Sequence, residues 1–370
     1  MARPGRTLDD SQKHIRNVLR DLRTKPPCFK RFTMKKKILI VMVTFSVFLL
    51  TTSRPGQNAA VLHKSEGRIV PAAAPVNTLV SFHKPDGLIL SEGNIYFTSH
   101  DASLATVWRT AQGSSPGHES VIYCEPGARF GDIVFAKVGG NFFGYFFATT
   151  GNGATITIKR IPLSGGAATV LATISNVDIA NSHRNLITDG VDLFWQDDTH
   201  IRKMPIGGGA ITVLDTTSPN TPTAGLALQV DRIIYASVAD VRFVHKTGDI
   251  TAPQVRTIAR ASSTVTALHA VSNGVYWGER GGAVRLKVGA TVTTLPSIAG
   301  LVPTSISTNG FTAGGAQAWT QCGSQTCRMQ FAFPVTNFSE AIGAGAFGVT
   351  VTSSGNVFWG DAAGVHRQTF

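Results

Sequence analysis

In this sequence of 370 residues, the side chains best suited to catalysis or metal binding are acidic and histidine residues that follow short apolar runs. Asp197, Asp198 and His200 lie close together, and His183 and Arg184 precede them. Carboxylate oxygens and imidazole nitrogens can together hold a divalent metal ion. Aspartates in turns also accept hydrogen bonds from the backbone and are common there for that reason. Because the spacing alone is weak evidence for a metal site, we favour this second interpretation. We therefore predict no metal ion and no cofactor.

Two further pairs of polar residues follow aromatic runs at similar places. Glu279 and Arg280 could form a general acid beside a cation that holds a substrate, or a solvated pair in a loop. His100 and Asp101 occupy the corresponding place in an earlier segment. The sequence has no nucleophile elbow, no zinc-protease helix motif and no phosphate-binding loop. We therefore assign no catalytic residue.

These polar residues belong to a repeat of roughly forty residues. Seven segments share an aliphatic run, a turn, a short run that ends on an aromatic residue, a polar loop and two more strand-like runs. One large ring per unit, buried between neighbouring sheets, explains such a repeat, because it removes roughly 150–250 Å² from water. The aromatic residues expected between the sheets are Phe97, Phe147, Trp195, Tyr235, Trp277, Trp319 and Trp359.

The repeat predicts the fold. The unit at 186–214 shows four strand-like runs separated by turns, one of them Asp189-Gly190. Four short strands bury little surface alone, so the units must stack, and a period of about 40–45 residues is typical of β-propellers. The predicted class is all-β, a seven-bladed β-propeller with four antiparallel strands per blade. Six or eight blades are alternatives.

The two ends of the repeat region predict how the ring closes. The last unit stops after its third strand, at 365–369, and lacks a fourth. The segment 78–82 resembles the fourth strands of other units. We therefore expect this amino-terminal strand to pair into the last blade, which would leave no open sheet edge between the first and last blades.

In this architecture, the loops between second and third strands and the connections between blades emerge on one face, where ligand sites usually lie. The candidates on that face are His100, Asp101, His183, Arg184, Asp197, Asp198, His200, Glu279 and Arg280, and the connections add Glu125, Arg129 and Asp132.

Two units resemble a known repeat. The strings LFWQD at 193–197 and VFWGD at 357–361 resemble the YWTD-type repeat of low-density-lipoprotein-receptor propellers and of related bacterial exported propellers. The likeness covers residues 76–370 loosely, and that family usually has six blades. It implies that the aromatic residues pack between blades, that Asp197 and Asp361 form hydrogen bonds at a blade edge, and that the protein binds a ligand or another protein.

The positive charge lies mainly at the amino terminus. The whole chain has a formal net charge of +12, of which the first 37 residues carry +9 and the remaining residues +3. A protein that follows a phosphate backbone needs a basic surface where it docks. The nearly neutral repeat region therefore predicts no nucleic-acid binding.

The amino-terminal region is predicted to direct export. Three lysines at 35–37 precede an apolar run at 38–50, and small residues near Ser53 and Ala60 offer cleavage sites, the order of a signal peptide. We divide the chain into a basic extension at 1–33, a signal peptide or short anchor at 34–60, a linker at 61–75 and the propeller at 76–370. Translation could start at Met34, and an uncleaved single-pass anchor is the alternative. Both place the propeller outside the cytoplasm, in the periplasm, the envelope or the surroundings.

The cysteines suggest one disulfide. Cys322 and Cys327 flank a turn-rich tetrapeptide between two strand-like runs, and opposite positions on a hairpin can meet disulfide distances. We predict that they pair. Cys124 is then expected to be a single, buried or half-buried thiol.

Two functions fit these observations. The first is an exported, non-catalytic binding or scaffold propeller that presents loops to a protein or glycan, contacts the membrane only through its amino-terminal segment, and is a monomer. The alternative is a propeller enzyme, a lyase or hydrolase, with its active site at the mouth of the central channel. The sequence favours binding, because it contains no local catalytic motif.

Overall fold

The computed structural model describes residues 76–369, apart from gaps at 82–84, 101–103, 151–154, 176–185, 198–199, 217–223, 249–255, 310–315, 325, 334–335, 345 and 353. Within these ranges the chain forms seven antiparallel sheets of four strands each. This confirms the predicted all-β propeller with seven blades. No helix suited to crossing a bilayer occurs in the part of the chain that the structure describes.

Each sheet is one blade, numbered here in chain order. Blade 1 consists of β2 Pro85–Ser91, β3 Asn94–His100, β4 Leu104–Ala111 and β5 Ser120–Pro126. Blade 2 consists of β6 Ala128–Val138, β7 Asn141–Thr150, β8 Thr155–Pro162 and β9 Thr169–Ser175. Blade 3 consists of β10 Ile187–Thr188, β11 Asp192–Gln196, β12 His200–Pro205 and β13 Thr212–Thr216. Blade 4 consists of β14 Leu226–Gln229, β15 Arg232–Ser237, β16 Asp240–His245 and β17 Arg256–Arg260.

The remaining blades follow the same order. Blade 5 consists of β18 Val265–Val271, β19 Gly274–Glu279, β20 Val284–Val288 and β21 Thr291–Leu295. Blade 6 consists of β22 Val302–Thr308, β23 Gln317–Cys322, β24 Cys327–Phe333 and β25 Thr336–Ile342. Blade 7 consists of β26 Phe347–Val351, β27 Asn356–Asp361, β28 Gly364–Thr369 and β1 Asn77–Ser81.

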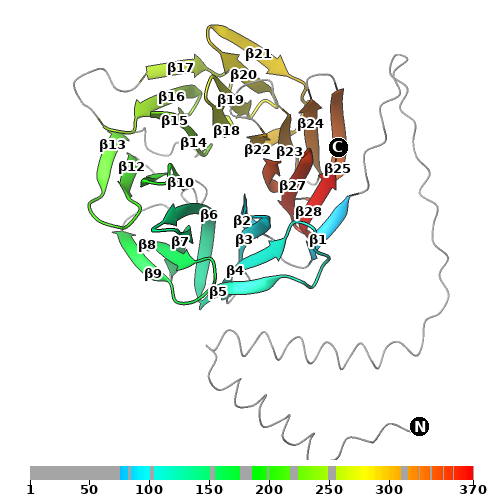
Figure 1. Cartoon of the computed structure of the whole chain (residues 1–370). Coiled ribbons are helices and arrows are strands. Elements are labelled where there is room, and N and C mark those ends of the chain that lie inside the picture. Colours follow the sequence, from blue (N-terminus) through cyan, green and yellow to red (C-terminus); the bar gives the residue numbers. More distant parts are fainter. Residues whose placement is uncertain are drawn as a thin grey trace, which may run out of the picture. The chain divides into compact units, whose positions relative to one another are not determined.

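The blades form a closed ring (Figure 1). The first strand of each blade is innermost, and each innermost strand contacts the next, from β2 to β6 and onward to β26, which contacts β2. Closure uses the predicted amino-terminal strand, because β1 pairs with β28 and places Val80 opposite Val365. The two described ends of the chain therefore complete one sheet, and blade 7 has its full set of strands.

The second strand of each blade carries large side chains that face opposite neighbours, because successive residues on a strand point to opposite faces. In blade 3, Trp195 packs in the cluster shared with blade 2, whereas Phe194 packs in the cluster shared with blade 4. Blade 5 repeats this arrangement with Trp277 against blade 4 and Tyr276 against blade 6. None of the seven aromatic residues expected between the sheets is more than 1% exposed.

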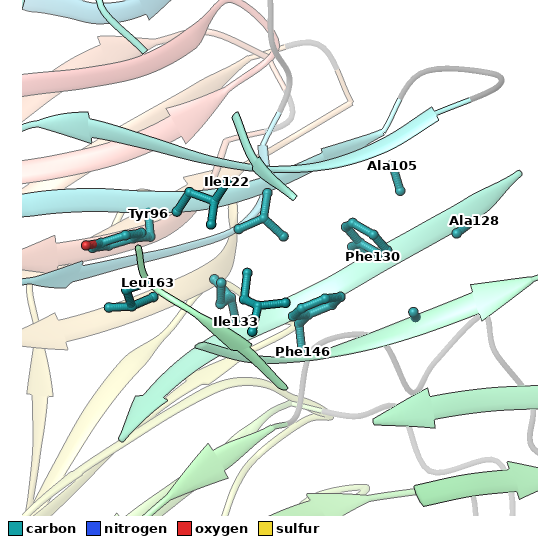
Figure 2. Packing of buried hydrophobic residues seen from close by; sticks show 11 residues of the cluster. Tyr96, Ala105, Ile122, Ala128, Phe130, Ile133, Phe146 and Leu163 are labelled. Atoms are coloured by element: carbon teal, nitrogen blue, oxygen red, sulfur yellow. The ribbon is translucent and has the colours of Figure 1, made fainter. Parts of the chain in front are cut away.

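In blade 2, the aromatic residue that packs like Trp195 lies one position before Phe147, the residue that the repeat predicts. Phe146 packs in the cluster shared with blade 1 (Figure 2), whereas Phe147 packs in the cluster shared with blade 3. Strand pairing agrees, because Phe146 lies opposite Lys159 as Trp195 lies opposite Arg202. Phe146 is therefore the structural equivalent of Trp195 in blade 2, and Phe147 is buried against the other neighbour.

The predicted disulfide is present. Cys322 and Cys327 are bonded across the hairpin between β23 and β24, where they lie directly opposite each other. Cys124 in β5 is disulfide-bonded as well, so the prediction of a single thiol is wrong.

Candidate functional site

The predicted ligand face is built from the hairpins between second and third strands. His100 ends β3, Asp197 follows β11 and His200 begins β12. Glu279 ends β19, and Arg280 lies in the turn that follows. Asp101, His183, Arg184 and Asp198 lie outside the described residues.

Glu279 is fully buried and holds the start of its own blade. Its Oε1 accepts hydrogen bonds from Trp277 Nε1 at 3.0 Å and from Arg285 Nε at 2.6 Å. Its Oε2 accepts hydrogen bonds from the hydroxyl and the backbone N–H of Ser262, in the connection that leads into β18. Burial raises the pKa of Glu279, but these donors outweigh it and hold the pKa below its ordinary value. The carboxylate is thus an ionised structural anchor.

Gln321 occupies the same position in blade 6, two residues after the buried Trp319. Its Oε1 accepts a hydrogen bond from the N–H of Ile298 at 3.1 Å, and its Nε2 donates to the carbonyls of Gly282 at 3.0 Å and Leu301 at 3.2 Å. The amide therefore joins the connection into β22 to the hairpin of blade 5.

Asp361 has the same role in blade 7. It accepts a hydrogen bond from the N–H of Gly343 at 3.0 Å, in the connection into β26, and it lies 2.9 Å from His366 Nε2. The other nitrogen of this ring lies 3.3 Å from the hydroxyl of Thr78 on the closing strand. Burial raises the pKa of Asp361, but the contact with His366 and the backbone N–H groups lower it below its ordinary value. Asp361 thus supports the blade that closes the ring.

Asp197 is the corresponding residue of blade 3 and is only 4% exposed. It accepts a hydrogen bond from the N–H of His200 at 2.8 Å and one from the guanidinium of Arg202. We call Asp197, Glu279, Gln321 and Asp361 the clamp residues. Their position explains their burial, because a residue two places after a tryptophan that packs against the neighbouring blade points to the same side of the strand.

The group around Asp197 does not assemble a metal site from the residues described. His200 Nδ1 lies 3.4 Å from Asp197 Oδ1. Among the described residues, no three His, Cys, Asp or Glu side chains are grouped so that they could hold a metal ion. The structure therefore brings Asp197 and His200 together, whereas Glu279 belongs to a different blade and is bonded within it.

A cavity of about 330 Å³ lies where the innermost strands of all seven blades meet, and we call it the channel cavity. In five blades the innermost strand changes register beside it. Such bulges bend a strand and re-aim a side chain. One residue at each of these irregularities lines the cavity: Asp86, Asp132, Thr266, Thr304 and Gly348.

The threonines at the bulges bind the backbone. Thr304 donates a hydrogen bond to the carbonyl of Ala346 at 3.1 Å, and Thr266 donates to the carbonyl of Gly278 at 3.3 Å. The carboxylate of Asp86 contacts Nδ1 of His100, which is about one-third exposed at the end of β3. Of the predicted residues, His100 therefore lies next to the cavity and Asp132 lines it.

Blades 1 and 2 approach each other closely at the two cavity carboxylates. A Cβ atom on Gly87 would lie 2.9 Å from the Cα of Asp132, so only glycine fits there. Thr98 ties the same two blades together by donating a hydrogen bond to the carbonyl of Gly131 at 2.8 Å. Asp86 and Asp132 are consequently held on adjacent strands.

Sequence reasoning singled out Asp132 but missed Asp86 and Gln321. Gln321 has a detectable signal, because Trp319 and Gln321 repeat the spacing of Trp277 and Glu279. Asp86 has none, because its orientation depends on a bulge that the residue types do not reveal.

The fold and the cavity define a seven-bladed β-propeller with a ligand-sized space on its axis. No family profile matches the sequence, and no curated protein matches it. Solved propellers are similar in fold. Streptogramin B lyase has 16% sequence identity and a TM-score of 0.59, with 80% of this chain and 97% of that chain covered. The WD40 β-propeller domain of Doa1 has 13% identity and a TM-score of 0.55, with 80% and 96% covered. A chain of the mitotic checkpoint complex has 12% identity and a TM-score of 0.56, with 84% and 99% covered.

Proposed function

We propose that this chain is an exported, non-catalytic β-propeller that binds a protein or glycan through the hairpins of one face. The observation that carries the proposal is the contrast between two adjacent residues in the hairpin of blade 5, one buried and one exposed. Glu279 is buried and bonded on all sides, whereas the next residue, Arg280, has an exposed side chain. Binding residues are found disproportionately on loops that a rigid scaffold positions, and Arg280 lies on such a loop.

Export rests on the order of charge and hydrophobicity at residues 34–60. We expect the native protein to be found in the envelope or the medium, with its first residue near position 54 or 61. Amino-terminal sequencing of the fractionated native product tests this. A product that begins at Met1 or Met34 and stays in the membrane fraction would instead indicate an uncleaved anchor.

The partner is tested by site-specific photo-crosslinking in the native host. A photoreactive residue at position 280 is expected to capture one discrete protein or glycan. The matched control is position 287, because Lys287 lies at the other end of the same hairpin, in β20. Equal capture from both positions, or no capture from position 280, would contradict the proposal.

A propeller enzyme is the second candidate, because Asp86 and His100 form a carboxylate–imidazole pair beside the channel cavity. Such a pair can act as a general base, and one structural neighbour is named a lyase. The test is elimination activity on uronate polysaccharides and hydrolysis of lactones, measured for the wild type and His100→Ala. The control is His245→Ala, because His245 forms a similar pair with Asp231 on the surface. Activity that survives His100→Ala rules out this assignment.

A further inference from the structure

A second cavity lies at the seam between blades 4 and 5. Its volume of about 350 Å³ falls at the lower end of the range for small-molecule pockets, which is about 300–1,000 Å³. Its wall includes Gln229 and Arg232, beside the turn between β14 and β15, and Gly289, in the turn between β20 and β21. These turns lie at the opposite end of the antiparallel strands from the hairpin of Arg280. We call this space the seam cavity, and it is separate from the predicted ligand face.

Each of the two blades directs one cation into the seam. Arg232 lies two residues before Ile234, which packs in the cluster shared by blades 4 and 5, so the two side chains lie on the same side of β15. Lys287 lies opposite Val275 of the same cluster, and residues opposite each other on paired strands have their side chains on one face. Both cations line the cavity, which therefore has a positive side chain on each of its two walls.

The guanidinium of Arg232 is held in place but keeps its hydrogen-bonding capacity. It lies 4.5 Å from the centre of the Phe243 ring, a cation–π contact. Its Nε lies 3.4 Å from Oδ1 of the exposed Asp231, yet this nitrogen has no hydrogen-bond acceptor. Among the described residues, none accepts a hydrogen bond from the two terminal nitrogens either. A guanidinium has five N–H donors, so Arg232 can still bind an anion.

The charges around the seam cavity are positive in sum. The ammonium of Lys287 has no ion-pair partner in the part of the chain that the structure describes, and no described Asp or Glu lines the cavity. Asp231, which lies beside the wall, also contacts Nδ1 of His245 at 3.3 Å. Arg232 and Lys287 contribute +2 and Asp231 contributes −1, which leaves a charge of +1 at neutral pH. This balance favours a monoanion.

The walls of the seam cavity are preformed and partly apolar. Gln229 Nε2 donates a hydrogen bond to the carbonyl of Val271 at 2.8 Å, which fixes the two blades to each other. Ile258 lines the cavity and packs against the shared cluster, and the stem of Lys287 is also hydrocarbon. A ligand therefore meets its charged and apolar contacts with little ordering cost.

A carboxylate suits these groups better than a phosphate. The planar fork of a guanidinium matches a carboxylate through two parallel hydrogen bonds. A phosphate group carries close to two negative charges at neutral pH, which exceeds the single positive charge of the site.

We propose that the seam cavity binds a small organic carboxylate, which Arg232 and Lys287 hold from the two blades, with its hydrocarbon part against Ile258. This site does not depend on a partner at the hairpin of Arg280, so the two proposals can fail separately. A photoreactive residue at position 287 replaces Lys287, so the crosslinking control does not report on the seam cavity.

The test is titration calorimetry of the full chain with three probes of similar size, 3-phenylpropanoate, 3-phenylpropanol and 3-phenylpropylammonium. The carboxylate is expected to bind about tenfold more tightly than the alcohol, and the ammonium probe not at all. Added salt should weaken only the carboxylate.

Four variants sharpen the test. Arg232→Gln and Lys287→Gln should each weaken the carboxylate probe about tenfold, because each removes one of the two cations. Asp231→Asn should strengthen it about threefold, because it removes the negative charge beside Arg232. The matched control is Arg160→Gln, which removes a guanidinium that lies 4.9 Å from the ring centre of Phe143 in blade 2. The control should leave the affinity unchanged.

Four results would overturn the proposal. The alcohol and the carboxylate could bind equally, which would show an apolar site. Arg232→Gln and Lys287→Gln could both bind like the wild type, which would place the site elsewhere. The carboxylate could show no binding to the wild type. Asp231→Asn could bind the carboxylate more weakly, which would contradict the charge balance of the site. If one cation variant does not fold, as judged by its thermal midpoint, the other variant and the comparison of probes on the wild type still decide the outcome.

Discussion

Blades 5 and 2 attach to their neighbours by different means. In blade 5, Trp277 packs against blade 4, and the buried Glu279 accepts hydrogen bonds from the connection into the blade. In blade 2, the residue two places after Phe146 is Ala148, which is also buried but offers no polar group. Its contact with blade 1 is aromatic, because the ring of Tyr123 in blade 1 lies 5.8 Å from that of Phe130 and 5.9 Å from that of Phe146.

Blade 2 adds other supports in place of the clamp. Its inner strands are the longest in the molecule among the described residues, with 11 residues in β6 and 10 in β7. Lys159 reaches Glu125 of blade 1 at 2.5 Å. The comparison shows that the residue at the clamp position helps to attach a blade to its neighbours. Either a polar network or an apolar cluster can make this attachment. A carboxylate there is therefore poor evidence of catalysis.

The largest expected effect is at the polar clamp of blade 5. Glu279→Ala should lower the free energy of unfolding by about 3–5 kcal/mol, because it leaves the buried Trp277 Nε1 without its acceptor and removes the ion-pair partner of Arg285. Denaturant unfolding at neutral pH measures this. Arg280→Ala, at the exposed neighbour, should change stability by less than about 0.5 kcal/mol. A small effect of Glu279→Ala would show that the clamp does not hold the blade.

The next effect is a dependence on pH in the same blade. Burial lowers the pKa of His269 to about 4, and its Nε2 lies 3.1 Å from the hydroxyl of Thr308 in blade 6. The unfolded chain takes up the proton first as pH falls. Stability is therefore complete above about pH 6.5 and is lost as pH falls towards 4, by up to about 3 kcal/mol.

This loss is measured by unfolding between pH 7 and 5. His269→Gln should flatten the curve there, whereas His245→Gln, on the surface, should not. Glu279 and Asp361 have lowered pKa values, so their contribution is lost only at lower pH. An unchanged slope in His269→Gln would contradict the assignment.

A smaller effect tests the aromatic side of the comparison. Tyr123 of blade 1 and Phe146, whose rings lie 5.9 Å apart, should show a coupling energy of about 0.5–1.5 kcal/mol in a double-mutant cycle with leucine substitutions. The matched cycle of Tyr123 with Phe147 should show none, because Phe147 packs towards blade 3. Equal coupling in the two cycles would contradict the one-residue shift in blade 2.

The smallest effect concerns blade 4, which has Ser237 at the clamp position. Its hairpin contains Val238, which is 48% exposed and has a φ of 55°. A β-branched residue is strained in this region, whereas asparagine tolerates it. Val238→Asn should raise the free energy of unfolding by about 0.5–1 kcal/mol. Loss of stability would show that the side chain makes contacts that outweigh the strain.

Much of the fold could be predicted from the sequence, because each unit of the repeat contains one large aromatic residue that is buried in its blade. Trp195, Trp277 and Trp359 mark their strands, and the missing fourth strand of the last unit indicated closure by β1. The shift in blade 2 could not be found, because three consecutive aromatic residues satisfy both orientations of the strand.

The site was harder to predict for a physical reason. Asp197 and Glu279 attract notice because carboxylates do chemistry, yet both point to the buried side that their tryptophans share. Asp86 lines the cavity because a bulge between Pro85 and Gly87 turns it there, and residue types do not reveal bulges.

The central claim is that the clamp residues are structural and that the exposed hairpin residue beside Glu279 meets the partner. Photo-crosslinking from position 280, in the wild type and in folded Glu279→Gln, tests it most directly. We predict the same discrete capture in both backgrounds and none from position 287. Loss of capture in folded Glu279→Gln, or equal capture from positions 280 and 287, would contradict the claim.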